Sequence, residues 1–321
     1  STRPHGGVQH GITMTDGAME RCDSRLATGY RVLREANPRI LESRLSDDRP
    51  LAAYALGHLE PELIERSEFW TADGPEGSAT VMHSRALGLV TVTLGDPHAV
   101  GAILSLHPGH RLGYLTTGSP DHIRVIARTH EVEDTLPMER MSVTPLTFED
   151  VPGEVRRLSG RDAGRINAIY AMEGSPARYP AEVIDRAIYY GTFDGDRLTS
   201  VAGTHIVSPH QSIAVVGNVF THPGYRGRGL ATRVTGAVTR DLLARGCTEI
   251  VLTVAPQNKP AVAAYSRLGY RQGSAVVEAR LQRRDLAGVG PGWRRLRARR
   301  RGRPIGNDIE WVRGHHTEGS R

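Results

Sequence analysis

A four-residue apolar repeat between residues 230 and 246 is the clearest pattern in the sequence. Its members are Leu230, Val234, Val238 and Leu242, and polar residues take the other side. This spacing predicts an amphipathic helix that ends at Gly246. Two β-prone apolar runs, at 198–207 and 212–220, precede the helix. They flank a short polar turn and predict a hairpin that leads into a loop before the helix.

The segment before this hairpin predicts a strand and two helices. An apolar run at 155–158 indicates the strand, and helical spacing recurs at 161–174 and around 182–187. Asp194-Gly195 then marks a tight turn between strand-like segments. Adding the strand and helix expected after the amphipathic helix gives the order β-α-α-β-β-β-α-β-α-β. This alternation predicts an α/β domain with a mixed sheet.

The N-terminal half also alternates between helical and strand-like patterns. The expected elements, in order, are a helical pattern from about 31 to 45 interrupted at Pro38, a helix within 50–70, strands at 79–83 and 87–94, and a helix capped by Asp96. A proline-rich stretch at 135–153 is expected to connect this half to the next one. The N-terminal half is therefore predicted to be a second α/β domain.

Length and composition agree with this organisation. A chain of 321 residues exceeds one typical domain, so two are expected, at 31–145 and 146–282. Residues 1–30 are rich in Gly and His without periodicity, and are predicted to be a flexible arm. Residues 283–321 are rich in Arg and are predicted to be a flexible tail.

The loop before the amphipathic helix carries the chemistry. Gly227 and Gly229 remove side chains where the backbone can expose successive N–H groups, and the helix N-terminus adds a partial positive charge. The loop therefore predicts a site for an anion such as a pyrophosphate. It is not a P-loop, because Leu230 and Ala231 follow the last glycine instead of Lys and Ser or Thr. It is not a dinucleotide fingerprint either, because Thr232 stands at the sixth position.

Residues 226–231, R-G-R-G-L-A, resemble the acetyl-CoA loop of the GNAT N-acetyltransferase superfamily, written Q/R-x-x-G-x-G/A. A second element follows at the spacing typical of that family: Asn258, Tyr265 and the triplet Leu268-Gly269-Tyr270. The resemblance covers about residues 146–282 and implies the GNAT fold, in which the fourth and fifth strands part to admit the pantetheine arm. The N-terminal half is similar in its order of elements to a GNAT half that lacks this loop, so a tandem form with a degenerate first half is expected.

The resemblance also implies which residues bind and act. The expected acetyl-CoA contacts are Val219, Phe220, Thr221, Arg226, Gly227, Arg228, Gly229, Leu230, Ala231, Thr232 and Asn258. Asn258 is expected to cap the helix that follows it as well. Tyr265 matches the tyrosine that protonates the departing thiolate in many relatives, although its place on an apolar stripe also suits a core residue. Because an unperturbed phenol has a pKa near ~10, it is protonated at neutral pH and suits the role of general acid.

The residues do not settle the general base. Relatives often carry a carboxylate on the fourth strand, but Val215, Val216, Gly217 and Asn218 occupy that strand in this chain. Glu173 and His205 are the candidate side chains. A chain of water molecules is an equal alternative.

Charge and cysteine content narrow the partners. The net charge of +6 is concentrated in residues 281–321, which hold 11 Arg against 4 acidic residues, so the remainder is nearly neutral. Specific nucleic-acid binding is not expected from such a tail, because it lacks interleaved aromatic residues. Cys22 and Cys247 are expected to be plain thiols, and the absence of clustered Cys/His spacing argues against a metal cofactor. No apolar run reaches a membrane span, so a cytoplasmic protein without a membrane partner is expected.

Three functions remain open on the sequence alone. The first is an N-acetyltransferase that moves the acetyl group of acetyl-CoA to a primary amine. The second is transfer of a larger acyl group, as in glycine acyltransferase-like enzymes, and the third is a non-catalytic acyl-CoA-binding regulator. The acceptor is not identified, and the oligomeric state is left open, with a homodimer among the options.

Overall fold

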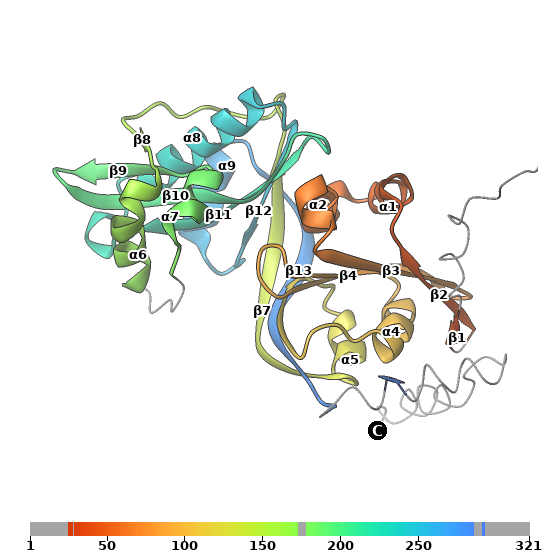
Figure 1. The fold of residues 1–321 in the computed structure, drawn as a ribbon. Helices are drawn as coiled ribbons and strands as arrows, with labels where there is room; N and C mark the ends of the chain where they lie inside the picture. Colours follow the sequence, from red (N-terminus) through yellow and green to blue (C-terminus); the bar gives the residue numbers. More distant parts are fainter. Residues whose placement is uncertain (1–24, 28, 173–177, 286–290, 293–321) are drawn as a thin grey trace, which may run out of the picture.

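The computed structural model describes residues 25–27, 29–172, 178–285 and 291–292. Within these residues, thirteen strands form one continuous sheet, in the order β1-β2-β3-β4-β5-β6-β13-β7-β12-β11-β10-β9-β8. Helices cover both faces of the sheet, and the chain folds into two lobes that meet at β7 and β13 (Figure 1). The sheet therefore runs through both halves of the chain without a break.

The first half supplies the strands and helices of one lobe. Its strands are β1 (Arg25–Ala27), β2 (Tyr30–Glu35), β3 (Ser67–Gly74), β4 (Gly77–Ser84), β5 (Val90–Gly95), β6 (Leu112–Thr117) and β7 (His130–Val143). Its helices are α1 (Pro38–Leu45), α2 (Arg49–Gly57), α3 (Pro61–Ile64), α4 (Pro97–Leu106) and α5 (His122–Ile126). Asp96 caps α4 by accepting a hydrogen bond from the Ala99 N–H, as the sequence predicts.

The second half repeats this order. Its strands are β8 (Arg156–Arg157), β9 (Tyr190–Asp194), β10 (Arg197–Ser208), β11 (Ile213–Thr221), β12 (Glu249–Val254) and β13 (Arg271–Arg283). Its α-helices are α6 (Ala163–Ala171), α7 (Ala181–Arg186), α8 (Leu230–Ala244) and α9 (Lys259–Arg267). The 3₁₀ turns η1 (Gly160–Asp162) and η2 (Pro223–Tyr225) precede α6 and the glycine loop. The predicted order of this half is confirmed.

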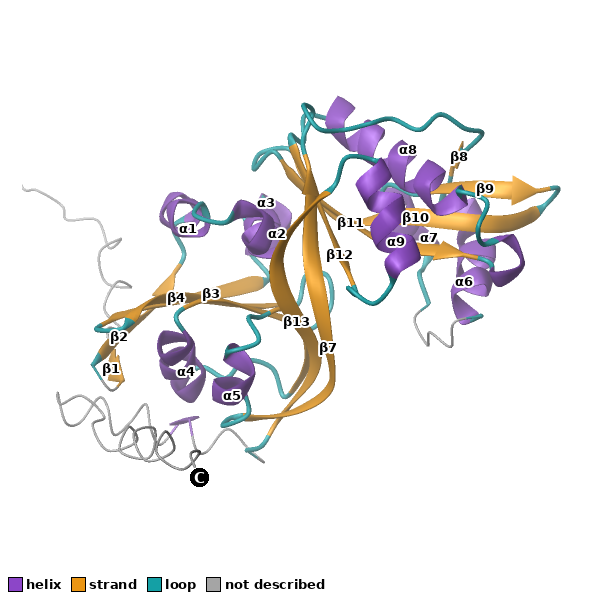
Figure 2. Ribbon diagram, turned by 180° about the vertical axis from the view of Figure 1, so that it is seen from behind, coloured by secondary structure: helices purple, strands orange, loops and turns teal. Residues whose placement is uncertain are grey.

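The two halves exchange their last strands. β13, from the second half, pairs with β6 of the first half, and β7, from the first half, pairs with β12 of the second. The two exchanged strands also pair with each other, as the long central strands of Figure 2 show. Apart from β1, which has no counterpart at the other end, equivalent strands follow in the same order from both ends of the sheet, and the parallel pairs β5–β6 and β11–β12 lie at corresponding places.

Helices of both halves share each face of the sheet. Successive residues of β11 show the division, because Val215 packs with α2 while Val216 packs with α8. The helices on the first face are α1, α2, α6 and α7, and those on the second are α4, α5, α8 and α9. Helix α2 packs beyond its own half, against Ile206, Val215 and Val251. This hydrophobic cluster therefore joins the two halves.

The predicted helices at 31–45 and 50–70 are partly wrong. Residues 30–35 form β2, and α1 starts at Pro38, where a missing N–H costs nothing. The second pattern contains α2 and α3, but its last residues start β3. Short apolar runs do not separate helix from strand by spacing alone, and pairing between β2 and β3 decides in favour of the sheet.

The stretch at 135–153 also differs from the prediction of a connection. Residues 130–143 form β7, which contains Pro137. This proline lies beyond Glu139, the last residue of β7 that pairs with β12, so its missing N–H is tolerated near a free edge. Residues 25–27, which were expected in the N-terminal arm, form β1. Residues 1–24, which include Cys22, and nearly all of the expected tail lie outside the described residues. Within the part that is described, no helix is long and apolar enough to cross a membrane.

Candidate functional site

The glycine loop ends in an open helix N-terminus. Gly227 and Gly229 have φ angles of 76° and 72°, in the left-handed region, and a Cβ added to either would meet nothing within 4 Å. Gly229 is the N-cap of α8, and no side chain caps the helix. Among the described residues, the backbone N–H groups of 227–232 find no acceptor. Six backbone donors at the positive end of a helix are therefore without a described protein acceptor, which suits a pyrophosphate.

The two strands beside this loop part in front of it. β11 and β12 pair in parallel from Ile213–Glu249 to Val216–Leu252, and the pairing then stops although β11 continues to Thr221. Asn218 has a φ of 54°, and its carbonyl oxygen accepts a hydrogen bond from the Tyr170 hydroxyl at 2.5 Å. Because the carbonyl and the next N–H of a trans peptide point in opposite directions, the Val219 N–H points away from Tyr170 and α6. The free edge of β11 thus offers backbone groups beside the opening.

The residues expected to bind acetyl-CoA are brought together around this opening. Val219 and Thr221 are partly buried and Phe220 is buried, and all three lie on the end of β11 that still pairs with β10 but no longer with β12. The Arg226 guanidinium lies 5.8 Å from the centre of the Phe220 ring, and that of Arg228 lies 4.9 Å from the Tyr225 ring. Neither arginine forms an ion pair with a described carboxylate, so both charges are available to an anion.

Asn258 lies at the start of α9 and caps it. Its side-chain oxygen accepts a hydrogen bond from the Ala261 N–H at 3.3 Å, and the residue is exposed. The predicted capping is confirmed, while contact with acetyl-CoA stays a prediction.

Tyr265 lies in the core under α8, with 7% of its surface exposed. Burial raises its pKa to about 12, so the phenol keeps its proton at neutral pH. No hydrogen-bond partner of its hydroxyl is found in the part of the chain that the structure describes. A protonated hydroxyl that no described group uses can donate its proton to a leaving group within its reach.

Strand β11 carries no carboxylate. Glu173 lies outside the described residues. His205, on β10, places its Nδ1 2.6 Å from the hydroxyl of Tyr54 on α2, and packs against Gly217. Burial lowers the pKa of His205, which keeps the ring neutral near pH 7.

Sequence analysis missed three groups around Asn218. Its side-chain oxygen accepts a hydrogen bond from the Tyr179 hydroxyl at 3.1 Å, and its amide nitrogen donates one to the Tyr189 hydroxyl at 2.9 Å. Together with Tyr170 these tyrosines hold Asn218 in its left-handed conformation. An asparagine within an apolar strand is a sequence signal for a residue in the left-handed conformation, since Asn tolerates positive φ better than most residues.

Comparison with known proteins gives the family of the residues around this site. Residues 163–270 match the family model "Acetyltransferase (GNAT) family". These residues are a GNAT domain. A 56-residue segment, 17% of the chain, is 38% identical to "Acetyltransferase SG1711" of Sodalis glossinidius and covers 39% of that protein. The chain thus spans about two fifths of the length of this curated relative.

Two solved structures share the fold of the GNAT domain and its N-terminal extension. A putative GNAT acetyltransferase from Novosphingobium aromaticivorans is 22% identical with a TM-score of 0.52, and covers 74% of this chain and 100% of its own. A Drosophila protein is 15% identical with a TM-score of 0.54, over 76% of this chain and 87% of its own. The shared fold therefore extends beyond the residues that match the family model.

The first half has a counterpart of the opening in the GNAT domain, but a histidine fills it. β5 and β6 pair in parallel only as far as Val92 and Thr117, and β5 continues to Gly95. Beside this unpaired end lies His122, 1% exposed, whose Nδ1 is 2.9 Å from the Thr93 hydroxyl and whose Nε2 is 2.9 Å from the Gly95 carbonyl oxygen. These contacts occupy both ring nitrogens of His122 and the carbonyl oxygen at the end of β5. The corresponding edge of β11 in the GNAT domain is left free.

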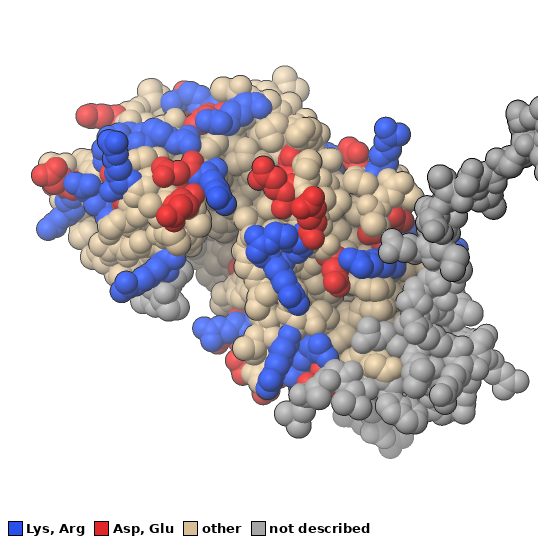
Figure 3. Space-filling model, in the orientation of Figure 1, with Lys and Arg blue, Asp and Glu red and all other residues tan. Residues whose placement is uncertain are grey.

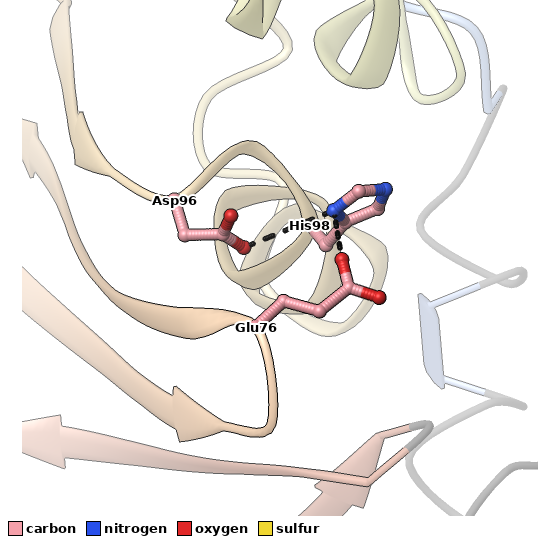
Figure 4. A group of neighbouring side chains, drawn as sticks. All are labelled: Glu76, Asp96 and His98. Carbon is pink, nitrogen blue, oxygen red and sulfur yellow. Dashed lines mark ion pairs between the residues drawn. The ribbon is translucent and has the colours of Figure 1, made fainter.

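Two other polar clusters lie in the first half, away from the glycine loop. Figure 4 shows Glu76, Asp96 and His98, whose ligand atoms lie within 4.8 Å of one another. The His98 ring pairs with the Glu76 carboxylate, and Asp96 caps α4, so the group already satisfies itself. A cavity of about 490 Å³ holds the second cluster, where His107 stacks on Trp70. Neither cluster contacts the GNAT opening.

Charge on the visible face is mixed. Lys and Arg are interspersed with Asp and Glu over the described part of both lobes in Figure 3. This face therefore offers no extended basic surface of the kind that binds nucleic acid.

Proposed function

We propose that the protein is an N-acetyltransferase that moves the acetyl group of acetyl-CoA to a primary amine by direct attack in a ternary complex. The parting of β11 and β12 directly before the open N-terminus of α8 carries the proposal. Within a few residues of each other lie a free strand edge, backbone donors that no described acceptor uses, and two arginines without a described ion-pair partner. The family match of residues 163–270 supports acyl transfer in general.

Binding and chemistry divide between the two ends of the opening. The N–H groups of 227–232, with Arg226 and Arg228, hold the pyrophosphate, and Asn258 contributes at the start of α9. The free edge of β11 at 219–221 pairs with the pantetheine arm, and its N–H groups polarise the thioester carbonyl. The amine nitrogen attacks that carbon, a C–N bond replaces the C–S bond, and Tyr265 gives its proton to the departing thiolate.

Gly229→Glu is expected to weaken acetyl-CoA binding by at least about tenfold, because a carboxylate at the helix N-terminus repels the pyrophosphate and occupies its space. Isothermal titration calorimetry with acetyl-CoA measures the change. Gly246→Glu is the matched control, since Gly246 follows the other end of α8, also at positive φ and in open space. Equal affinity in the wild type and the Gly229→Glu protein would remove the loop from the binding site.

The reaction itself is tested by thiol release from acetyl-CoA over a panel of primary amines, repeated with longer acyl-CoA thioesters. Amine-dependent release that is fastest with acetyl-CoA is the expected result. Faster release with a longer thioester would favour the larger-acyl alternative. Tight binding of acetyl-CoA without release over the whole panel would favour the regulator.

A further inference from the structure

We infer that the reacting centre is shared between the halves of the chain, with His205 as the proton acceptor for the amine and Tyr54, from the N-terminal half, as the residue that positions it. The inference rests on the proposed acetyl transfer. It names the group that takes the proton of the amine at a site where β11 carries no acidic side chain.

The ring of His205 lies where the opening between β11 and β12 begins. Its ring lies over Gly217, so that a Cβ on that glycine would come within 2.5 Å of ring atoms Cε1 and Nε2. Gly217 is the first residue of β11 after the pairing with β12 ends. The missing side chain thus brings Nε2 against the strand at the point where the opening begins, one residue before Asn218.

The ring of His205 is accessible from solvent. His205 is exposed to solvent, and burial among protein atoms nevertheless has the largest influence on its pKa. His83 and His122 differ, since both are buried and both of their ring nitrogens are held by protein atoms. Among these three histidines, only His205 combines access from solvent with a place at the opening.

Tyr54 contacts the other ring nitrogen of His205, Nδ1. It lies on α2, 151 residues before His205, and its hydroxyl is 2.6 Å from Nδ1. Burial raises the pKa of Tyr54, so it stays neutral. When Nδ1 carries the hydrogen and donates it to the phenol oxygen, Nε2 keeps its lone pair toward β11. Tyr54 is buried in a hydrophobic cluster with α1 and β3, and the Arg140 guanidinium lies 5.3 Å from the centre of its ring.

The charges around the ring favour a neutral base. Burial has the largest effect and lowers the pKa of His205, the neighbouring Asn218 side chain partly opposes this, and the positive charge of Arg140 on β7 lowers the pKa. A base that is neutral at pH 7 accepts a proton without first losing one.

The proton balance closes through solvent. The amine nitrogen bonds to the thioester carbon and passes one proton to Nε2 of His205. The C–S bond breaks, and the thiolate takes a proton from Tyr265. Water then carries the proton of His205 back to the Tyr265 phenolate, so that the products are the amide and free CoA thiol.

The tautomer can be tested without knowing the acceptor. In the wild-type protein with ¹⁵N-labelled histidine, NMR at pH 7 is expected to show His205 neutral, with hydrogen on Nδ1. Tyr54→Phe removes an acceptor that stabilises the charged ring, so it is expected to lower the His205 pKa further. A ring with hydrogen on Nε2, or one that is charged at pH 7, would overturn the inference.

Kinetics test the catalytic step. His205→Asn keeps a polar atom near Tyr54 but deletes Nε2, and is expected to lower kcat with the best amine of the panel by at least about 10²-fold. Acetyl-CoA affinity is expected to stay the same. His210→Asn is the matched control, in the turn that follows the same strand, where the ring pairs with Glu60 on the surface. Turnover of the His205→Asn protein within about threefold of wild type would exclude His205 as the base.

The pH profile separates a positioning role from a merely structural one. Activity falls at low pH as the base becomes protonated, so a lower His205 pKa in Tyr54→Phe moves this limb of kcat/KM to lower pH. A purely structural role of Tyr54 would lower activity without moving the limb, and would contradict its positioning role. Failure of acetyl-CoA to bind the wild type would reject the proposed function instead, and calorimetry detects that case separately.

Discussion

Tyr265→Phe is expected to lower kcat by about 10²–10⁴-fold, the usual contribution of a general acid, when departure of the thiolate limits the rate. Acetyl-CoA affinity is expected to change little, because phenylalanine fills the same buried space. Burial raises the Tyr265 pKa to about 12, so the wild-type hydroxyl is protonated across the neutral range and the loss should appear at every pH up to about 10. Steady-state turnover and calorimetry on the same protein measure both quantities.

Tyr270→Phe is the matched control for this substitution. Tyr270 is buried in the same core, its ring centre 6.1 Å from that of Tyr265, and its hydroxyl is 2.8 Å from the Thr239 hydroxyl. Removing that hydrogen bond costs about 1 kcal/mol of stability and should leave turnover unchanged. If Tyr265→Phe behaves in the same way, with chemistry shown to limit the rate, Tyr265 is a core residue and not the acid.

Gly269→Ala is expected to reduce the free energy of unfolding by about 2–5 kcal/mol, which combines a strained backbone with an overpacked contact. Gly269 has a φ of 83°, and a Cβ would lie 1.7 Å from the carbonyl oxygen of Thr147. Both segments are held by backbone, because the Leu268 carbonyl oxygen accepts a hydrogen bond from the Glu149 N–H in the same contact. Neither segment can move away without losing that hydrogen bond. Chemical denaturation with a two-state analysis measures the loss.

Gly246→Ala isolates the backbone part of this effect. Gly246 has a φ of 90°, and a Cβ added there would have no atom within 4 Å, so alanine meets strain but no contact. The expected cost is about 1–2 kcal/mol. Equal losses in the two variants would show that the Thr147 contact relaxes and that only the backbone conformation matters.

Local patterns predicted the parts of the GNAT domain that depend on local interactions. The four-residue stripe from Leu230 predicted α8, and the two glycines predicted the open loop, because spacing and positive φ are properties of a short segment. Residues 30–35 failed the same test. Their apolar spacing suits a helix or a strand, and the partner that decides, β3, lies more than thirty residues away.

The candidate site divides along the same line. The loop residues and Asn258 could be found from sequence, since each belongs to a recognisable segment. Tyr54 could not, because it reaches His205 from a helix of the other half, 151 residues earlier. The exchange of β7 and β13 could not be predicted either, because nothing in the sequence of either strand indicates whether it pairs with β6 or with β12.

That exchange affects the order in which the chain can fold during synthesis. Tyr114 of β6 meets Glu278 of β13, 164 residues later. At a translation rate of about 5–20 residues per second, the neighbour of β6 leaves the ribosome on the order of 10–30 s after β6 itself. During this interval β6 presents an unpaired edge, and open edges invite pairing with other chains. Folding of this protein in a cell should therefore depend more on chaperones, and on the pace of translation, than its stability alone would suggest.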